Sequence, residues 1–428
     1  MSDSLEYWVL GELNIFKKSE DDFDLMSGNG SLLSLDREAS IAVLTMNGPA
    51  DFQRWEKDLS EYDIKPEKTE LKKILSLMQQ SGLVETKPMK MEKMDYKKVI
   101  KNTDKFEHGP LGISNVVIST TSACLYDCIY CLRQPMKIGK QVEKEFVYKT
   151  MEDISQLGCR LVTFSGGEPG LVKENLKQYI KFARDRGIRS RALATRGYNF
   201  DRDTVVELKN MGLTDVVVSL DSGSEMQDQI SRYKGAFSIA LSALQSAKDV
   251  GLRTAINLTY FGQGLEEIEK VSEIVKKLGI RMKVTPLVPR GNLKPLSPEE
   301  TIQLEKHVER LSNEGYNVAC IASRQQYRSY DTPMICEAGI ARAHVEADGD
   351  VSGCQFVGYI PDAIAGNIQD GFLNVWLNGN WSFYREAPPI NEKCGACNDR
   401  KYCISNCLAM ADVLFGQPKM INTPPCNK

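Results

Sequence analysis

Hydrophobic and polar positions along the middle of the chain predict strands and helices in strict alternation. Short apolar runs typical of buried strands are each followed by a stretch with an apolar residue every three or four positions, typical of a helix. The predicted strands are Ile113–Ser119, Cys159–Phe164, Arg189–Ala194, Asp215–Leu220, Arg253–Thr259 and Arg281–Thr285. The predicted helices are Lys144–Gln156, Lys173–Arg186, Asp203–Asn210, Ala236–Val250 and Leu265–Leu278. This alternation favours an α/β fold with a parallel sheet, whose functional residues lie at the carboxyl ends of the strands.

The pattern before this region is different. Residues 1–86 have short strands followed by helices, which predicts a small α+β domain. Its predicted strands are Tyr7–Phe16, Asp22–Met26 and Ser31–Leu35, and its predicted helices are Arg37–Leu44 and Leu71–Gln80. Residues 87–109 are polar and rich in lysine, so we interpret them as a charged linker, with a basic peptide-docking strip as the alternative.

The alternation ends after Pro289. We therefore assign residues 110–290 to the βα domain, residues 291–335 to a bridging region and residues 336–428 to a third, loop-rich domain. The third domain holds seven of the twelve cysteines.

Composition indicates a folded protein of two or three domains. The chain has 428 residues, of which 42% are hydrophobic and 26% charged. Its net charge of −3 is unlike the basic footprint of nucleic-acid-binding proteins, so we expect no nucleic-acid partner. No apolar run approaches the roughly 18 residues of a membrane span, and Met1–Leu10 lacks the basic start of a secretory signal. We therefore expect no membrane association and a cytoplasmic location.

The cysteine spacing indicates a metal centre. In a reducing compartment, so many cysteines are more typical of metal ligands or catalytic thiols than of disulfides. Cys124, Cys128 and Cys131 follow the first strand of the βα domain at C-x3-C-x2-C spacing, with an aromatic residue before the last thiol. Three soft thiolates without a nearby fourth suit a [4Fe-4S] cluster with one open iron, whereas structural zinc, the alternative, usually takes four ligands.

The second strand is followed by Ser165-Gly166-Gly167-Glu168-Pro169, where two glycines permit close backbone approach to a ligand. Together with the three cysteines, this motif resembles the radical S-adenosylmethionine enzymes over residues 110–290. The resemblance implies a partial (β/α)6 barrel and an open iron that chelates S-adenosyl-L-methionine, with Gly166, Gly167 and Glu168 holding the methionine amine. It also implies reductive cleavage to a 5'-deoxyadenosyl radical, which abstracts a hydrogen atom from the substrate.

The resemblance extends to other strand ends. Ser219 and Asp221 close the fourth predicted strand, Leu287 follows the sixth, and Arg232 precedes a Gly-Ala-Phe sequence. The family implies Ser219 and Arg232 as contacts to the ribose or carboxylate of the cofactor and Leu287 as a further cofactor contact. The alternative to a cofactor contact is that Arg232 is a solvated residue at the start of a helix. The third strand ends in Thr-Arg-Gly, where the family usually has Thr-Asn-Gly, so Arg196 receives no role.

The C-terminal cysteines form a second pattern. They are Cys336, Cys354, Cys394, Cys397, Cys403, Cys407 and Cys426. Their spacing resembles the SPASM extension of enzymes that modify peptides and proteins, which implies two auxiliary [4Fe-4S] clusters. The first would be held by Cys336, Cys354 and Cys407, and the second by Cys394, Cys397, Cys403 and Cys426. These seven cysteines leave one iron of the first auxiliary cluster without a ligand. The candidates for that ligand are Cys320, the substrate and solvent, although the apolar surroundings of Cys320 favour a buried structural thiol. A pair of zinc knuckles is the alternative for the whole set.

Residues 1–86 are similar to the small winged-helix domain that binds the leader of precursor peptides, which takes the leader as an added strand. A domain that only covers the barrel is the alternative. The three histidines, His108, His307 and His344, are not placed in a Ser/His/Asp or Cys/His arrangement, so no hydrolytic site is predicted.

The favoured function is maturation of a ribosomally made precursor peptide by an intramolecular crosslink, either a thioether or a carbon–carbon or carbon–oxygen bond. The implied cofactors are S-adenosyl-L-methionine and three [4Fe-4S] clusters, one that binds S-adenosylmethionine and two auxiliary. The implied partners are the precursor peptide with its leader and an electron donor such as flavodoxin or ferredoxin.

Two other functions stay open. The first is formylglycine formation in sulfatases, against which Gln355 counts because such enzymes usually place Asp directly after the second SPASM cysteine. The second is a non-catalytic iron-sulfur electron carrier, which would not require the glycine-glycine-glutamate motif.

Overall fold

The structure, a computed structural model, describes residues 7–10, 13–17, 22–27, 32–46, 48–80, 83–87, 109–110, 112–131, 139–288, 293–320, 338–385 and 409. Most of the predicted charged linker lies outside the described residues. The same is true of six of the seven C-terminal cysteines, namely Cys336, Cys394, Cys397, Cys403, Cys407 and Cys426.

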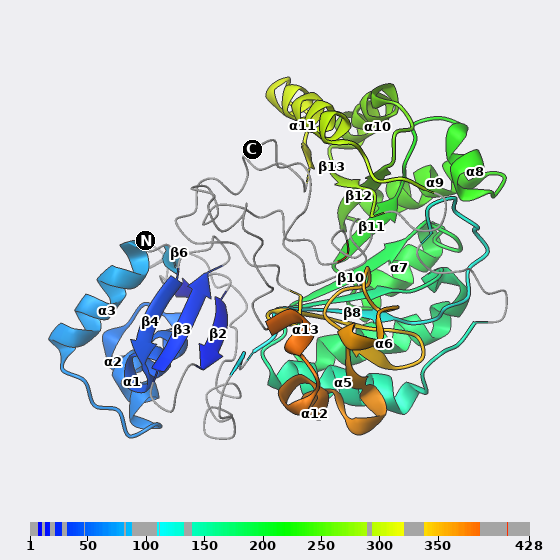
Figure 1. The fold of residues 1–428 in the computed structure, drawn as a ribbon. Helices are drawn as coiled ribbons and strands as arrows, with labels where there is room; N and C mark the ends of the chain where they lie inside the picture. Colours follow the sequence, from blue (N-terminus) through cyan, green and yellow to red (C-terminus); the bar gives the residue numbers. More distant parts are fainter. Residues whose placement is uncertain are drawn as a thin grey trace, which may run out of the picture.

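Ten described strands form one sheet in the order β14-β13-β12-β11-β10-β9-β8-β15-β16-β17. Its six consecutive strands from β8 to β13 confirm those predicted in the βα region. They are β8 (Asn115–Ser119), β9 (Leu161–Ser165), β10 (Ser190–Thr195), β11 (Asp215–Ser219), β12 (Arg253–Tyr260) and β13 (Arg281–Pro286). All neighbouring pairs among them are parallel, so their carboxyl ends share one edge (Figure 1). The fold is therefore α/β with a parallel-dominated sheet.

The predicted helices of this region are also confirmed, within one residue at each end. They are α5 (Lys144–Gln156), α6 (Lys173–Asp185), α7 (Arg202–Met211), α9 (Ala236–Asp249) and α10 (Leu265–Leu278). A short additional helix, α8 (Met226–Ser231), precedes α9. Local sequence sets the ends of α7, because the Asp201 side chain accepts from the Thr204 N–H and Gly212 adopts a left-handed conformation at φ 116°.

The prediction that the alternation ends after Pro289 is wrong. Helix α11 (Pro298–Asn313) leads into β14 (Val318–Cys320), which pairs in parallel with β13. A capping box at Ser297 and Glu300 starts α11. Strand β14 has only three residues, too few to give a recognisable period in the sequence. Cys320 is 1% exposed within it, as expected of a structural thiol.

The other edge of the sheet is built from the C-terminal region. Strand β15 (Arg342–Val345) pairs in parallel with β8, and β16 (Asp350–Ser352) and β17 (Ile364–Asn367) follow in antiparallel order. Helices α12 (Phe372–Asn378) and α13 (Ser382–Arg385) complete this part, with the 3-10 turns η4 (Pro361–Ala363) and η5 (Ile368–Asp370). Its buried side chains belong to the same hydrophobic core as those of β8–β14.

The N-terminal residues form two small sheets with helices. The strands are β1 (Tyr7–Leu10), β2 (Leu13–Lys17), β3 (Asp22–Ser27), β4 (Leu32–Asp36), β5 (Gly48–Pro49), β6 (Val84–Lys87) and β7 (Gly109–Pro110). The helices are α1 (Arg37–Thr45), α2 (Phe52–Ser60) and α3 (Lys68–Gln80). The predicted strand Tyr7–Phe16 is thus divided between two sheets, ordered β5-β1-β6 and β4-β3-β2-β7, and α2 was not predicted.

This N-terminal unit has a hydrophobic core of its own. Phe23, Leu25 and Trp55 are at most 2% exposed and belong to a cluster separate from the core of the main sheet. The Trp55 Nε1–H donates to the Ala42 carbonyl over 2.9 Å, so its buried polar atom is satisfied. Separate cores support a domain boundary between this unit and the βα region. None of the described helices combines the length and apolarity needed to cross a bilayer.

Candidate functional site

The loop that follows β8 carries Cys124, Cys128 and Cys131 at the carboxyl edge of the sheet. Cys124 and Cys128 are partly buried and Cys131 is exposed, and none forms a disulfide. Burial raises the pKa of the Cys124 thiol to about 11 and that of Cys128 to about 12. These thiols are therefore neutral without a metal, and iron would deprotonate them on binding.

The described residues contain no three Cys, His, Asp or Glu side chains that converge as ligands of a single metal ion. A cubane cluster has a different requirement, because each thiolate binds a different iron atom. Three cysteines on one loop, with soft sulfur donors and no fourth cysteine beside them in the described region, fit such a cluster.

Helix α8 fixes the backbone of the cysteine loop. The Asp127 and Ile129 N–H groups donate to the Ser231 and Ile230 carbonyls, each over 3.0 Å. The next residue, Arg232, adopts a left-handed conformation at φ 48° and ends the helix. Its guanidinium pairs with the Asp127 carboxylate over 2.9 Å, both side chains being more than half exposed. In the structure Arg232 is thus neither an isolated solvated residue nor a helix start; it contacts the cysteine loop.

The two glycines of the Gly-Gly-Glu motif pack against the chain that leads into the cysteine loop. Gly166 has a φ of +134°, and a Cβ there would lie 2.3 Å from the Thr121 carbonyl oxygen. A Cβ on Gly167 would lie 2.0 Å from the Ala123 carbonyl oxygen. The Gly167 N–H donates to Thr121 over 2.7 Å, and the Glu168 N–H donates to Ala123 over 2.8 Å. The glycines therefore permit a close approach between two loops of the protein itself.

The Glu168 carboxylate joins the ends of β9 and β10 and is 1% exposed. Its Oε1 accepts from the Gly170 N–H at 3.0 Å and from the Thr195 hydroxyl at 2.5 Å, and its Oε2 accepts from the Arg196 N–H at 2.9 Å. Burial raises the pKa of Glu168, and these donors oppose that rise. A carboxylate has about four acceptor positions, and donors of the protein itself occupy three of those of Glu168.

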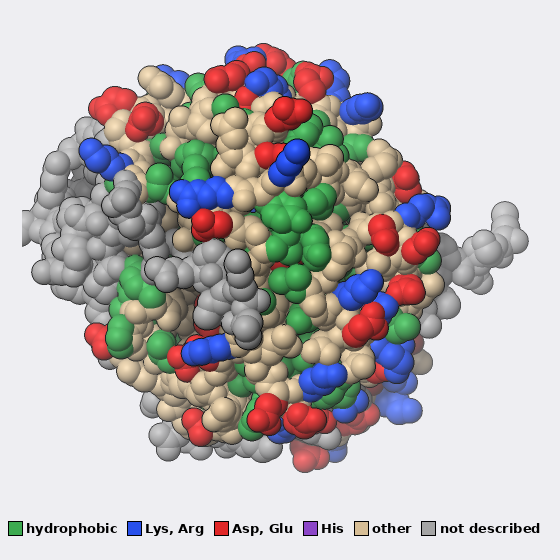
Figure 2. Space-filling model, turned by 90° about the vertical axis from the view of Figure 1, so that its right-hand side faces the viewer, with side chains coloured by type: hydrophobic (Ala, Val, Ile, Leu, Met, Phe, Trp, Pro, Cys, Tyr) green, Lys and Arg blue, Asp and Glu red, His purple; other side chains and the backbone are tan. Residues whose placement is uncertain are grey.

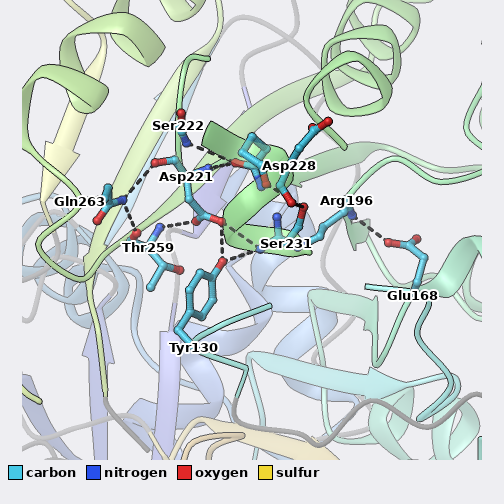
Figure 3. Close-up of polar contacts among 10 residues, drawn as sticks. Tyr130, Glu168, Arg196, Asp221, Ser222, Asp228, Ser231, Thr259 and Gln263 are labelled. Carbon is cyan, nitrogen blue, oxygen red and sulfur yellow. Dashed lines mark hydrogen bonds and ion pairs between the residues drawn. The ribbon is translucent and has the colours of Figure 1, made fainter. Parts of the chain in front are cut away.

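A buried polar network connects the third and fourth strand ends to the cysteine loop (Figure 3). The Arg196 guanidinium pairs with Asp221 over 2.9 Å and donates to the Tyr130 hydroxyl over 2.5 Å. The Tyr130 hydroxyl in turn donates to Asp221 Oδ2 over 2.6 Å. The guanidinium carbon also lies 5.8 Å from the ring centres of Tyr126 and Tyr130. Arg196 had no predicted role, and its departure from the usual Asn was the only signal in the sequence.

Asp221 is 0% exposed and is held by several further contacts. Its Oδ1 accepts from the Thr259 N–H over 2.9 Å, and its own N–H donates to Gln227 over 2.7 Å. Gln263 donates to the Asp221 carbonyl over 3.0 Å. The carboxylate is therefore fixed in position beneath Arg196.

The other predicted contacts lie along the same edge. Ser219 ends β11 and is paired in register with Asn257 of β12. Asn257 accepts from the Thr285 hydroxyl over 3.1 Å, which links the fifth and sixth strands. Leu287 is 4% exposed, and its N–H donates to the Tyr260 carbonyl over 2.8 Å. The strand ends thus come together as predicted, although Leu287 is buried by protein contacts.

His344, for which the sequence predicted no Ser/His/Asp arrangement, lies in the structure between a serine and a glutamate. Ser119 Oγ lies 2.9 Å from His344 Nε2, and His344 Nδ1 lies 3.3 Å from the Glu346 carboxylate. Ser119 and His344 are 2% and 1% exposed. The sequence could not bring these residues together, because they are 225 positions apart and meet only through the β8–β15 pairing. Their burial indicates a structural link between the two parts of the sheet.

Among the seven C-terminal cysteines, Cys354 is the one that the structure describes. It follows β16 and is partly buried. Its carbonyl accepts from the Ser352 hydroxyl over 3.2 Å, and its sulfur accepts from the Phe356 N–H over 3.5 Å. An N–H donor to sulfur is a common neighbour of an iron-bound thiolate.

Charged side chains of both signs are interspersed on the face of the molecule in Figure 2. This mixture agrees with the small net charge of the chain. On that face, electrostatics favours neither a polyanion nor a polycation as partner.

Comparison with known proteins identifies the central domain. Residues 118–291 match the family described as the radical SAM superfamily. Over these residues the chain contains a radical SAM domain. The match covers the cysteine loop, the Gly-Gly-Glu motif and the strand ends described above.

Proteins with several different names share sequence with this chain. Fe-coproporphyrin III synthase of Methanosarcina barkeri is 30% identical over 164 residues, which are 38% of this chain and 41% of that protein. Mycofactocin maturase MftC of Mycolicibacterium smegmatis is 24% identical over 342 residues, covering 76% of this chain and 85% of the maturase. The stretch shared with the maturase is therefore longer than the region 118–291 that matches the family.

Among solved structures, Streptococcus suis SuiB bound to S-adenosylmethionine is similar over 98% of this chain and 100% of SuiB, with a TM-score of 0.72 and 15% identity. SuiB bound to the precursor peptide SuiA gives a TM-score of 0.68 with the same coverage. At this identity the likeness shows a common fold, and it extends over nearly the whole chain.

Proposed function

We propose that this radical SAM enzyme is a peptide maturase that forms an intramolecular crosslink in a ribosomally synthesised precursor peptide. The observation that carries the proposal is the similarity of nearly the whole chain, including its N-terminal and C-terminal parts, to SuiB, which has been solved with the precursor peptide SuiA. The extended relationship to the mycofactocin maturase supports the same substrate class. Formylglycine formation has no comparable support, and Gln355 stands where such enzymes usually have Asp.

The residues present fit a [4Fe-4S] cluster and S-adenosylmethionine. Cys124, Cys128 and Cys131 would hold the cluster, because they are soft donors on one loop whose backbone α8 fixes. When bound, the cluster and S-adenosylmethionine would supply the organic radical that removes a hydrogen atom from the peptide. Gly166, Gly167 and Glu168 are the proposed contacts to the methionine amine, and Ser219 and Arg232 are the proposed contacts to ribose or carboxylate.

The two flanking parts would handle the peptide. The N-terminal unit has its own core and an edge strand, β4, to which an extended leader could add as a further strand. The C-terminal cysteines would hold two auxiliary clusters, which accept the second electron or position the peptide. The edge strand and the separate core support a leader-binding domain of winged-helix type, and a low-potential flavodoxin or ferredoxin is the proposed electron donor.

Coexpression with a short precursor peptide encoded beside this gene tests the function. We expect mass spectrometry to find a peptide that has lost two hydrogen atoms per crosslink and that resists fragmentation between the joined residues. The same peptide coexpressed with Cys128→Ala enzyme should be unmodified. Formylglycine made from Ser also loses two hydrogens but carries an aldehyde that reacts with a hydrazide. An unmodified peptide with the wild-type enzyme, or a hydrazide-reactive product, would count against the crosslinking function.

A further inference from the structure

Arg196 places a positive charge inside the protein, directly against the cysteine loop. Its side chain is 11% exposed. It donates to the hydroxyl of Tyr130, a residue that lies between the second and third cysteines in the sequence, and its guanidinium carbon is equally distant from the rings of Tyr126 and Tyr130. Two tyrosines of the cysteine loop therefore contact a cation that is almost out of contact with water, and Figure 3 shows Tyr130 beside it.

The position of this cation is fixed. Its backbone N–H is bonded to Glu168, and its guanidinium is bonded to Asp221, which is itself held by Thr259 and by two glutamines. The guanidinium therefore cannot turn toward solvent without breaking its contacts with Asp221 and Tyr130. One guanidinium nitrogen of Arg196 contacts one carboxylate oxygen of Asp221. A bidentate pair, with two parallel contacts, would neutralise both groups more completely.

Burying an arginine and an aspartate is costly, and apolar side chains of similar volume often stabilise a fold as well or better. The arrangement therefore calls for a function beyond stability. A neighbouring group with a changing charge would be the cluster on the cysteine loop, since each one-electron reduction adds one negative charge to it. In a medium of low dielectric constant, a fixed neighbouring cation interacts strongly with that change.

We propose that Arg196 is a positioning residue that sets the reduction potential of the cluster held by Cys124, Cys128 and Cys131. This inference rests on the proposed cluster at that loop. The cation stabilises the reduced, more negative cluster and so makes it easier for a low-potential one-electron donor to reduce. Asp221 limits the effect, because its negative charge opposes that of Arg196 at the same place.

The two charges predict shifts of opposite sign. In Arg196→Gln the cluster loses its cation and keeps the Asp221 carboxylate, so the midpoint potential should become more negative. In Asp221→Asn the cation loses its counter-charge, so the midpoint potential should become more positive. Arg196→Lys, which keeps the charge, should stay closer to wild type than Arg196→Gln. A merely structural role would lower cluster content but would not move the potential in two directions.

The experiment is an anaerobic dithionite titration of the full-length, reconstituted enzyme, followed by electron paramagnetic resonance. The relevant signal is the one that changes on addition of S-adenosylmethionine, which separates it from the auxiliary clusters. Arg253→Gln is the control, because Arg253 pairs with Asp215 at the opposite ends of the strands and is 63% exposed. Its midpoint should equal that of wild type.

Iron content and the cofactor-responsive signal in the wild-type enzyme test the proposed cluster independently. Their absence would defeat the proposed function. Their presence, with the same midpoint in wild type, Arg196→Gln and Asp221→Asn, would defeat the role of Arg196 alone. If Arg196→Gln fails to retain a cluster, the Asp221→Asn shift decides, and a midpoint that is unchanged or more negative overturns the proposal.

Discussion

At the residue scale, the site consists of side chains whose partners are mostly within the protein. In the sequence, Glu168 is a carboxylate that could bind a cofactor. In the structure, it accepts three hydrogen bonds from protein donors at the ends of β9 and β10. The motif glycines allow close contact between their own loop and the chain that leads into the cysteine loop. The sequence could identify these residues as special, because their types and spacing are unusual. It could not assign the partners, since those depend on how distant strand ends align.

Glu168→Gln should destabilise the protein by about 2 kcal/mol, because it removes a buried charge that strengthens three hydrogen bonds and turns an amide N–H₂ toward one donor. Thermal denaturation monitored by circular dichroism measures the change. Glu174→Gln on the exposed surface of α6 is the control and should leave the transition unchanged. Equal transitions for both variants would show that the Glu168 contacts contribute nothing to stability.

At the scale of elements, the regular βα region could be predicted closely, because both periods are strong and each helix lies between two strands. Strand β14 and the pairing of strand β15 escaped prediction for different reasons. Strand β14 is very short, and β15 pairs with β8 across more than two hundred residues. The Ser119–His344 contact depends on that second pairing, which explains why the sequence gave no sign of it.

A second link between distant elements joins α5 to α12. Asp153 on α5 is almost fully buried and accepts from the Leu373 N–H at the start of α12 over 3.1 Å, while it pairs with Lys149 over 2.9 Å. This carboxylate satisfies a free N–H of α12 as a capping residue would.

Asp153→Ala should therefore lower the free energy of unfolding by about 1–2 kcal/mol, because the helix start loses its acceptor. Urea denaturation of the full chain measures the loss. Asp185→Ala, which removes an exposed partner of Lys181, is the matched control. If both variants unfold at the same urea concentration, Asp153 does not hold α12 in place.

At the scale of the whole molecule, the chain combines a radical SAM domain with an N-terminal unit that has a separate core and a C-terminal part that shares the core of the main sheet. This difference predicts that the N-terminal unit can be removed more easily than the C-terminal part. The auxiliary clusters stay a sequence-based proposal, since most of their cysteines lie outside the described residues.

An enzyme that begins at Lys105 should retain its iron and cleave S-adenosylmethionine, yet bind full-length precursor at least about tenfold more weakly, because leader binding raises the local concentration of the core peptide. Fluorescence titration with labelled precursor measures the affinity, and a leaderless peptide is the control. Unchanged affinity for the precursor would indicate that the N-terminal unit only covers the sheet and does not bind the leader.

Cys397→Ala or Cys403→Ala should lower the iron content and abolish the crosslinked product. Some cleavage of S-adenosylmethionine should survive, because the proposed cluster on Cys124, Cys128 and Cys131 is separate from the auxiliary clusters. Iron analysis and product mass spectrometry of the two variants are the measurements. An iron content equal to that of wild type in both variants would rule out the second auxiliary cluster.

The most direct test of the radical site is the amount of 5'-deoxyadenosine that the reduced, anaerobic enzyme forms from S-adenosylmethionine. Wild type and Cys159→Ala, which loses a buried thiol of the same domain outside the cysteine loop, should both form it. Cys128→Ala should form none above the background of dithionite alone. Equal amounts from Cys128→Ala and wild type, or none from wild type with a full complement of iron, would contradict the assignment of the cysteine loop as the site of cofactor cleavage.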